Sequence, residues 1–552
     1  MLPLSSSDVN LNKNIRHQFP ALQQRINGQP LAYLDSAATS QKPAPVLAAI
    51  QHFYRRDNAN VHRAGYTIAA RATEQFEQAR AKVAGYFGMS ARNLVWTRGC
   101  TEAINFVAYS WALQQLNAGD LLVVSGLEHH ANLIPWQQVC RARNAELAII
   151  PVLATGELDQ QAFQQLLQRR PKLVALTHVS NVLGTVNPVA NMIALAHQYD
   201  AKVLIDGAQA AAHLTVDVAE LGADFYTFSG HKMYGPTGIG GVLLSNDMLN
   251  QCQPWQTGGE MVEAVSYDTA SWAQPPHCFE AGTPNIAGAI GLASAVAFLE
   301  QLPEDWQQQE AALLAYAQQR LAAIDGIRLI AAPAEQVAVQ SFVSDRIHPQ
   351  DLAQYLDQFG VAVRLGKHCA HPLLAALGEP VTLRLSLGCY SNQQDIDQLI
   401  AAIDAAHQGD TETAVSAENN HLDLDEAVAA LKVGQSWQQT LSRLIIVGKA
   451  LPSALKAERA PQYLIHDCES ATWLQLEHGE SGWQCLVDSE ANVVRGMLHL
   501  LALDFNRLAV AEQRQFDGRD WLAQQAFFQQ LSMTRQSGIS AAIEQLQQQL
   551  KT

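Results

Sequence analysis

One stretch decides the fold class of this chain: Phe228-Ser-Gly-His-Lys-Met-Tyr-Gly-Pro-Thr-Gly-Ile-Gly240. It follows a short apolar run that predicts a strand, and it sets Lys232 among glycines, Ser229 and His231. Glycines let the backbone approach a bulky ligand closely. A lysine amine that is desolvated can act as a nucleophile toward an aldehyde. A glycine-rich turn with a solvated lysine has the same sequence, so the surrounding motifs must decide between the two.

The segment Lys202-Val-Leu-Ile-Asp-Gly-Ala-Gln209 lies upstream and predicts a buried strand that ends at Asp206. A carboxylate in this place suits the pyridine nitrogen of pyridoxal phosphate, because it keeps the nitrogen protonated and the ring an electron sink. The alternative is an ordinary helix cap, since Asp is common where a helix follows a strand. Only the other motifs of the chain separate these two roles.

The wider pattern from about residue 90 to 245 alternates short β-branched runs with helical stretches. This alternation predicts a mostly parallel sheet with helices on both faces. Longer helices follow after about residue 300 and predict a smaller α+β domain. The predicted strands are Leu121–Ser125, Leu147–Val152, Leu173–His178, Lys202–Asp206 and Phe225–Phe228, and the predicted helices include Glu102–Gln115, Asp159–Arg169, Glu310–Ile324, Gln350–Phe359 and Gln536–Leu550.

The chain of 552 residues is too long for one hydrophobic core. Its polar stretch Gly409–Asn420 has no hydrophobic periodicity, which predicts a linker before a separate C-terminal module. The net charge of −16 and the lack of a basic run argue against a nucleic-acid or membrane partner. The uncharged stretch Ala281–Leu299 contains Pro284 and is rich in Gly and Ala, so a buried helix explains it better than a membrane span. With no signal peptide visible, we expect a cytoplasmic protein.

The eight cysteines are widely spaced and form neither a CxxC motif nor a Cys/His cluster. We therefore predict no metal site. Most of these cysteines should be small buried side chains, and one or two could carry chemistry.

Six motifs of this chain resemble those of the group II (SufS/CsdA-type) cysteine desulfurases, and the resemblance covers roughly residues 15–405. They are SGHKMYGPTGIG and IDGAQ together with Glu128-His-His-Ala-Asn132, Thr177-His-Val-Ser-Asn-Val-Leu-Gly-Thr185, Phe279-Glu-Ala-Gly-Thr-Pro-Asn285 and Arg364-Leu-Gly-Lys-His-Cys-Ala-His-Pro372.

The resemblance implies a fold-type I transferase that depends on pyridoxal 5'-phosphate, with a mostly parallel seven-stranded sheet between helices and a small α+β domain. The implied large domain is 1–300, whose N-terminal segment also packs with the small domain at 301–407. A linker at 408–424 and a C-terminal α+β domain at 425–552 follow.

The resemblance also implies roles for individual residues of the cofactor site. Lys232 is expected to bond covalently with the cofactor aldehyde and then to move protons. Asp206 is expected at the pyridine nitrogen, Gln209 and Asn181 at the phenolic oxygen, and His129 against the face of the ring.

The phosphate site should lie at the start of the helix that follows Thr97-Arg-Gly-Cys-Thr-Glu102, because a helix N-terminus attracts anions. The expected contacts are Thr101, Ser229 and His231, with a backbone contact from Cys100, where the family often has Thr. Thr283 is expected to reach the phosphate of the other subunit, which implies a homodimer with shared active sites.

Cys369 matches the family's sulfur-accepting cysteine, and the adjacent Arg364, Lys367 and His368 would favour its thiolate. Arg384 matches the arginine that grips the substrate carboxylate with two hydrogen bonds, and Arg364 would assist. Asn181 is also expected to contact the substrate. Cysteine must lose its sulfur from Cβ, and a thiolate is the natural acceptor because it forms an S–S bond.

The C-terminal module, from about residue 425, resembles the SufE/CsdE sulfur acceptors. The matching features are Ser436-Trp437, Gly448–Leu451, Asp467-Cys-Glu-Ser-Ala-Thr-Trp473, Asp488-Ser-Glu, Val494-Arg-Gly-Met497 and Leu531-Ser-Met-Thr-Arg-Gln-Ser-Gly538. Cys468 matches the acceptor cysteine, and Arg535 could steady its persulfide. Asp467 and Glu469 replace the family's Gly and Gln, and their charges should disfavour a thiolate.

The expected function is conversion of L-cysteine to L-alanine, with sulfur passing to Cys369 and then to Cys468. The family implies sulfur-accepting proteins of iron–sulfur cluster assembly as partners. The alternatives are a selenocysteine lyase or another enzyme that uses the same cofactor, with a C-terminal module that only docks.

Overall fold

The computed structural model describes residues 15–63, 65–419, 431, 437–465, 470–479, 482–525, 528 and 533–550. The chain divides into two compact units. The first extends to Ala323 and also takes Leu329–Phe342 and Ala362–Asp397. The second takes Ile324–Arg328, Val343–Val361 and the residues from Gln398 onward. These units differ from the predicted boundaries at 300 and 407, because segments of the predicted small domain lie in both.

A seven-stranded sheet forms the centre of the first unit. Only β10 runs antiparallel to its neighbours, so the sheet is mostly parallel, as predicted. In sheet order the strands are β4 (Leu94–Thr97), β10 (Gly240–Leu244), β9 (Phe225–Ser229), β8 (Lys202–Asp206), β7 (Leu173–Thr177), β5 (Leu121–Ser125) and β6 (Glu146–Ile150).

The central strands are buried on both faces, which is why they read as continuous apolar runs. All residues of β5, β7, β9 and β10 are buried, whereas the edge strand β6 is partly exposed. The predicted bounds of β5 and β8 agree with the structure, and those of β6, β7 and β9 end within two residues of it. The strands β4 and β10 were not predicted, because each is a short segment beside glycines.

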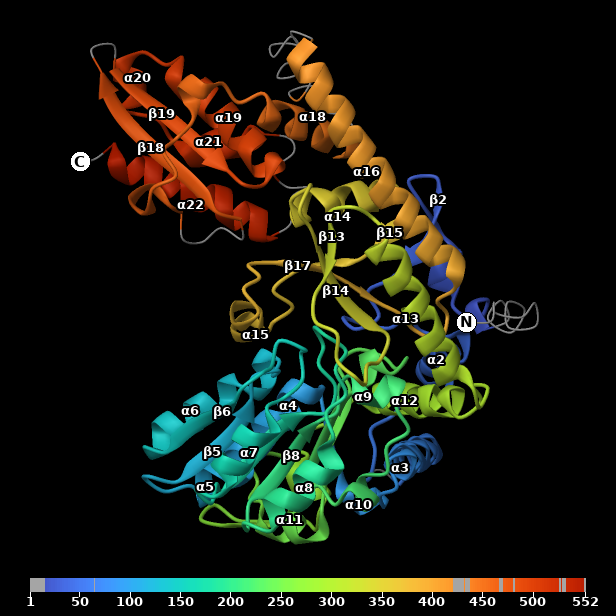
Figure 1. Ribbon diagram of the computed structural model, residues 1–552. Coiled ribbons are helices and arrows are strands. Elements are labelled where there is room, and N and C mark those ends of the chain that lie inside the picture. Colours follow the sequence, from blue (N-terminus) through green and yellow to red (C-terminus); the bar gives the residue numbers. More distant parts are fainter. Residues whose placement is uncertain are drawn as a thin grey trace. The chain divides into compact units, whose positions relative to one another are not determined.

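Helices flank these strands (Figure 1). The predicted helix Glu102–Gln115 is continuous but begins earlier, as α4 (Cys100–Val107), the π-helical turn η4 (Ala108–Ala112) and α5 (Leu113–Gln115). The other long helices of this unit are α2 (Ala44–His52), α3 (Thr67–Tyr86), α6 (Ile134–Arg143), α7 (Gln160–Leu167), α8 (Val189–His197), α12 (Ile286–Leu299) and α13 (Trp306–Ala322).

The uncharged stretch Ala281–Leu299 contains the buried helix α12 (Ile286–Leu299), which packs with α2 and α3. This confirms the predicted buried helix. Among the helices of the described residues, none combines the length and the hydropathy of a membrane-spanning segment.

The short elements of the first unit connect these layers. They are η1 (Pro20–Gln23), β1 (Arg25–Ile26), β2 (Gln29–Pro30), β3 (Ala32–Tyr33), η2 (Phe53–Asp57), η3 (Ala91–Asn93), η5 (His130–Asn132), α9 (Ala210–His213), α10 (Val218–Leu221), η6 (Gly230–Lys232), α11 (Asn246–Gln251), β11 (Val262–Val265), β12 (Ala270–Trp272), η7 (His277–Phe279) and α15 (His371–Ala376).

A second, antiparallel set of strands carries the later part of the site. β17 (Thr382–Ser386) pairs with β14 (Val339–Ser344) on one side and with β16 (Arg364–Gly366) on the other. The N-terminal segment adds to this set, because Ser386 N donates to Leu34 O (2.8 Å) and Leu34 N donates to Ala362 O (2.8 Å). Residues near 35, 364 and 384 are thereby brought together.

The second unit contains the C-terminal module, whose core packs a hairpin against helices. Its elements are α18 (Trp437–Lys449), η8 (Ser453–Leu455), η9 (Pro461–Tyr463), β18 (Thr472–Gly479), β19 (Gly482–Ser489), α19 (Asn492–Asn506), α20 (Val510–Gln513), α21 (Gly518–Ala523) and α22 (Met533–Gln549). The predicted helix Gln536–Leu550 corresponds to α22.

Two glycines let α18 and α19 approach closely. A Cβ on Gly448 would lie 2.0 Å from Asn492 O, and a Cβ on Gly496 would lie 2.0 Å from Leu444 O. Both glycines belong to segments quoted for the SufE-like resemblance, and the structure supplies a packing reason for them.

The same unit contains β13 (Ile327–Leu329) in part, β15 (Val361–Ala362) in part, and α14 (Pro349–Gln358). The buried Asp351 of α14 accepts hydrogen bonds from Asn492 N (2.9 Å) and Val493 N (3.3 Å). Its carboxylate therefore caps the first turn of α19.

The predicted linker at 408–424 differs from the structure in its first part. Helix α16 (Gln393–Asn419) continues through Gly409 to Asn419, and residues 420–424 lie outside the described residues. The segment contains no proline and several Ala and Glu residues, which have high helix propensity, so polarity alone did not end the helix.

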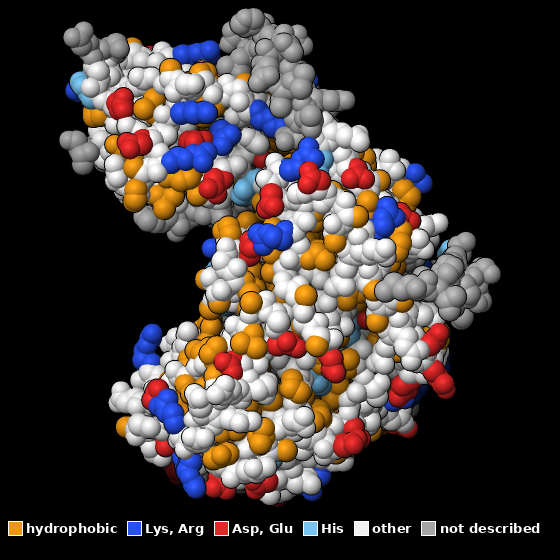
Figure 2. Space-filling model, viewed as in Figure 1, with side chains coloured by type: hydrophobic (Ala, Val, Ile, Leu, Met, Phe, Trp, Pro, Cys, Tyr) orange, Lys and Arg blue, Asp and Glu red, His pale blue; other side chains and the backbone are white. Residues whose placement is uncertain are grey.

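Charged side chains of both signs are interspersed on the face of the molecule that Figure 2 shows. This mixture agrees with an acidic chain that carries 36 Lys and Arg against 52 Asp and Glu.

Candidate active site

One cavity of about 190 Å³ lies at the carboxyl ends of β5, β7, β8 and β9. In this sheet the strand order switches at β5, which has β6 on one side and β7 on the other, and ligands of open α/β sheets bind beside such points. Twelve of the predicted site residues line the cavity: Cys100, Thr101, His129, Asn181, Asp206, Gln209, Ser229, His231, Lys232, Arg364, Cys369 and Arg384.

Lys232 ends the short turn η6 directly after β9, and its side chain lines the cavity. Burial lowers the pKa of its amine below the ordinary value, and the cations Arg384 and Arg364 act in the same direction, whereas Asp206 opposes them. The amine is therefore more easily deprotonated than a surface lysine, which is what a nucleophilic amine needs.

The backbone before Lys232 is held by residues that sequence reasoning missed. The carbonyl of His231 accepts hydrogen bonds from Thr39 Oγ1 (3.0 Å), Ser40 N (3.0 Å) and Lys42 Nζ (2.9 Å). Burial lowers the pKa of Lys42 to about 8. The segment before α2 gave no catalytic signature, and only its polar run Thr39–Lys42 hinted at this role.

Asp206 ends β8 and has one oxygen fixed by the protein. Oδ1 accepts from Ala208 N (2.9 Å) and from Cys100 Sγ (3.1 Å). Oδ2 makes no hydrogen bond to the described residues, and Asp206 lines the cavity. The carboxylate thus offers one free oxygen to a ligand.

His129 precedes η5, and its Nδ1 accepts a hydrogen bond from Ala131 N (3.0 Å). Burial and the nearby Lys232 lower the pKa of His129 to about 4. The ring is therefore neutral at physiological pH, with its proton on Nε2. A neutral ring of this kind can lie against an aromatic cofactor without adding charge.

The phosphate end of the cavity is formed by the start of α4 and the end of β9. Ser229 Oγ accepts a hydrogen bond from Cys100 N (2.8 Å), so its own hydroxyl proton remains to donate. Thr101 and His231 line the same region, and burial lowers the pKa of His231 to about 4. Neutral His231 offers an N–H donor.

Arg384 is buried on β17 and is held from two sides. Its Nη1 donates to Asn181 O (2.9 Å), and its Nη2 donates to Asp35 Oδ1 (2.9 Å). Its Nε is buried without a hydrogen-bond partner among the described residues. Asp35, which sequence reasoning missed, orients the guanidinium and leaves Nε for a further acceptor.

Cys369 lies in the loop after β16 and is exposed. Both His368 and Cys369 have positive φ, 52° and 53°, which is rare for residues with a side chain. Two consecutive carbonyls of the loop are anchored, because Asn181 Nδ2 donates to His368 O (2.8 Å) and His130 N donates to Cys369 O (2.8 Å). This strained loop places the thiol in the same cavity as Lys232.

One expectation about the cysteine's neighbours is wrong. His368 is buried, its Nε2 lies 2.9 Å from Thr382 Oγ1, and burial together with Arg384 holds the pKa of its imidazole well below the ordinary value. A neutral His368 adds no positive charge, so Arg364 is the predicted cation that lines the cavity beside Cys369.

Two predicted residues are not placed in this cavity, and a third, Asn181, lines it but makes a different contact from the one expected. Thr283 is exposed and lines another cavity of about 380 Å³, beside β4 and the start of α12. Cys468 lies outside the described residues, together with Asp467 and Glu469. Asn181 has one amide hydrogen bonded to the Cys369 loop rather than free for the cofactor.

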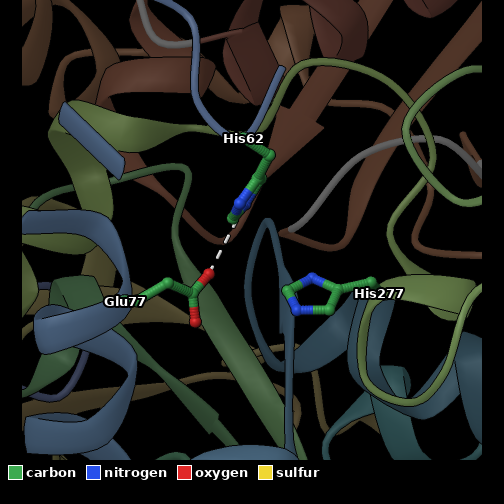
Figure 3. Close-up of side chains that lie close together, drawn as sticks. All are labelled: His62, Glu77 and His277. Carbon is green, nitrogen blue, oxygen red and sulfur yellow. Dashed lines mark ion pairs between the residues drawn. The ribbon is translucent and has the colours of Figure 1, made fainter. Parts of the chain in front are cut away.

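A separate group of side chains, from segments that sequence spacing does not connect, is shown in Figure 3. His62, Glu77 and His277 have potential metal-ligand atoms within 4.8 Å of one another. His62 Nε2 lies 3.5 Å from Glu77 Oε1, and Arg80 Nε donates to Glu77 Oε2 (3.1 Å). The Glu77 carboxylate is therefore shared between the imidazole of His62 and the guanidinium of Arg80.

Comparison with known families agrees with this geometry. The model of the class-V aminotransferases matches residues 32–399. The chain belongs to the class-V aminotransferase family. A second model, the Fe-S metabolism associated domain (SufE), matches residues 425–550.

Within this family, the similar proteins are cysteine desulfurases. A probable cysteine desulfurase of Vibrio cholerae serotype O1 is 50% identical over 402 residues, covering 71% of this chain and 97% of the relative. A cysteine desulfurase of Salmonella newport is 45% identical over 399 residues, covering 72% and 98%. The crystal structure of the Escherichia coli cysteine desulfurase CsdA is 40% identical, with a TM-score of 0.67, and covers 72% and 98%.

The chain is thus a cysteine desulfurase that depends on pyridoxal 5'-phosphate and is fused to a SufE-like domain. The residues of the desulfurase fit that cofactor. Asp206 Oδ2 is free to meet a protonated ring nitrogen. Gln209 Nε2 donates to Ala37 O (2.8 Å), so its buried Oε1, unpaired among the described residues, is the atom left for a donor of the ligand. The start of α4 with Ser229 suits the phosphate.

Proposed function

We propose that the desulfurase converts L-cysteine to L-alanine, takes the sulfur onto Cys369, and passes it to Cys468 of its own C-terminal domain for iron–sulfur cluster assembly. One observation carries the proposal: the side chains of Lys232 and Cys369 line the same cavity, although 137 positions separate them in the chain. An amine that binds the cofactor and a thiol that takes sulfur must both reach one amino acid.

The bound cofactor supplies an electron sink that labilises the bonds at Cα and Cβ of the substrate amino acid. The protein's own part begins with Arg384, whose unpaired Nε supports a hydrogen bond to the substrate carboxylate. Asp35 keeps the guanidinium in place. Lys232 Nζ, whose pKa is lowered by burial, takes and returns protons at the substrate carbons.

Sulfur transfer to Cys369 balances without an external oxidant. The thiolate Sγ of Cys369 attacks the substrate sulfur, an S–S bond forms, and the Cβ–S bond breaks. The electron pair of that bond stays with Cβ, which takes up a proton and becomes the methyl group of alanine. Cys369 then carries the persulfide.

Two partner roles belong to the same proposal. The exposed Thr283 would complete the phosphate site of a second subunit in a homodimer. The C-terminal domain at 425–552 would act as a separate functional module after the desulfurase domains at 1–300 and 301–407. Fusion raises the effective concentration of the acceptor near the donor.

Cys369→Ser tests the first step. We expect the variant to retain the cofactor absorbance but to lose alanine production by more than about 100-fold, because a hydroxyl is a poor sulfur acceptor. Cys140→Ser, a buried cysteine outside the cavity, is the matched control. Normal alanine release from L-cysteine by Cys369→Ser would disprove the proposal. If the variant lost cysteine turnover but processed selenocysteine normally, the selenocysteine lyase alternative would be favoured.

A time course of persulfides tests the second step. After L-cysteine is added, mass spectrometry of trapped peptides should show sulfur on Cys369 first and on Cys468 afterward. Cys468→Ser should leave the Cys369 persulfide to accumulate. A persulfide on Cys369 that never reaches Cys468 would instead indicate a C-terminal domain that only docks.

A further inference from the structure

The side chain of Cys100 contacts the carboxylate of the cofactor site, although the sequence predicted only a backbone contact with the phosphate. Its Sγ lies 3.1 Å from Asp206 Oδ1 and 3.0 Å from Thr227 Oγ1. The residue is buried, and it is the first residue of α4, so its backbone N–H also bonds Ser229 Oγ (2.8 Å). Cys100 therefore links the phosphate end of the cavity with the end of β8.

The direction of the hydrogen bond follows from its neighbours. The hydroxyl of Thr227 can donate to the carbonyl oxygen of Ile205 (3.3 Å) or to Sγ (3.0 Å), and neither arrangement uses the thiol proton. A carboxylate accepts only, so the proton between Sγ and Oδ1 is the thiol proton. Burial and the charge of Asp206 raise the pKa of the Cys100 thiol well above its ordinary value, which keeps this proton on sulfur.

We propose that Cys100 is a positioning residue whose S–H group, together with Ala208 N–H, fixes Oδ1 of Asp206 and so aims Oδ2 at the ring nitrogen of the cofactor. The inference rests on the proposed role of Asp206. Both donors bind the same oxygen, and Oδ2 has no hydrogen bond within the described part of the chain. A carboxylate held by one oxygen presents the other in a fixed direction.

The choice of sulfur has a chemical consequence. An S–H group is a weak donor, so it orients the carboxylate while withdrawing little of its negative charge. A carboxylate that keeps its charge stabilises a protonated ring nitrogen more strongly. In this chain the cysteine next to the phosphate loop thus acts on the ring end of the cofactor, separately from the sulfur-carrying Cys369.

The test measures cofactor affinity, not turnover. The dissociation constants of pyridoxal 5'-phosphate and of a carba analogue, in which C–H replaces the ring nitrogen, are measured by absorbance and fluorescence with the full-length chain. The variants are Cys100→Ala, the conservative Cys100→Ser and Asp206→Asn. Cys140→Ala, at a buried thiol outside the cavity, is the matched control.

We expect Cys100→Ala to weaken binding of the natural cofactor about tenfold, which corresponds to about 1.4 kcal/mol, and to change binding of the carba analogue by less than about twofold. Cys100→Ser should restore most of the loss, because its hydroxyl also donates. A purely structural role would weaken both ligands equally.

Three results would overturn the inference. Equal losses for both ligands, or no loss in Cys100→Ala while Asp206→Asn weakens only the natural cofactor, would remove the role of Cys100 and leave that of Asp206. If Asp206→Asn failed to discriminate between the two ligands, the proposed role of Asp206 would fail, and the inference with it.

Discussion

At the scale of single residues, burial sets the protonation states of the histidines around Lys232. The pKa of His129 and that of His231 are each lowered to about 4 by burial, so both rings are neutral at physiological pH. His368 is neutral for the same reason. The positive charge of the cavity is left to Lys232 and the arginines, which face Asp206 and Asp35. Residue types alone did not reveal this, because histidine titrates near neutral pH unless it is desolvated.

Glu128, beside His129, gives a prediction about pH dependence. Burial raises the pKa of Glu128 to about 8, although Ser125, Asn132 and Thr177 N donate hydrogen bonds to it. The folded state therefore binds more protons than the unfolded state between about pH 4.5 and 8, so this residue costs stability as the pH rises through that window. Below about pH 4.5 Glu128 is protonated in both states, so it does not reduce the stability there.

Glu128→Gln removes this titration. We expect the stability of the variant relative to the parent to increase from pH 5 to pH 8, by at most about 1.4 kcal/mol per pH unit. Urea unfolding of the holoenzyme at several pH values measures it, with Glu146→Gln at an exposed ion pair as the control. An unchanged slope in Glu128→Gln would contradict the raised pKa.

At the scale of elements, close packing of α18 against α19 explains two glycines that the sequence had linked only to a family resemblance. Gly448 in α18 and Gly496 in α19 each face backbone of the other helix, with no room for a side chain. The family motifs contain both glycines but do not give the separation of the two helices. Direct contact between the backbones of two helices requires glycine, and only the packed structure shows at which positions this contact occurs.

Gly496→Ala is expected to disrupt this contact. An added Cβ would lie 2.0 Å from Leu444 O, and backbone cannot move aside as a flexible side chain can. We expect the C-terminal module to lose about 3 kcal/mol or more of stability. Gly85→Ala in α3, where a Cβ meets nothing within 4 Å, is the control and should be neutral or stabilising by up to about 1 kcal/mol. Thermal unfolding of both variants gives the comparison.

At the scale of the whole molecule, the sequence families and the compact units divide the chain differently. The class-V aminotransferase match ends at residue 399, yet α14, inside that match, belongs to the same compact unit as the SufE-like module. Asp351 of α14 caps α19 of the module through two backbone N–H groups. A short polar contact of this kind leaves no periodic signal in the sequence.

Asp351→Ala tests the cap. Loss of a helix cap costs about 1 kcal/mol, so hydrogen exchange at the amides of Asn492 and Val493 should accelerate about fivefold to tenfold. Asp357→Ala, at an exposed position of the same helix, should leave these amides unchanged. If Asp351→Ala left the exchange rates as in the parent, α14 would not hold the module in solution.

The sequence by itself determined the α/β class, two of the central strands to the residue, and the motifs that meet in the cavity. These follow from local patterns, because burial of a strand and flexibility of a glycine-rich loop are written in neighbouring residues. Tertiary structure alone decided that Cys100 turns to Asp206, that Asp35 holds Arg384, and that α16 runs on to Asn419. Such contacts join segments far apart in the chain, and their strength depends on the desolvation that folding creates.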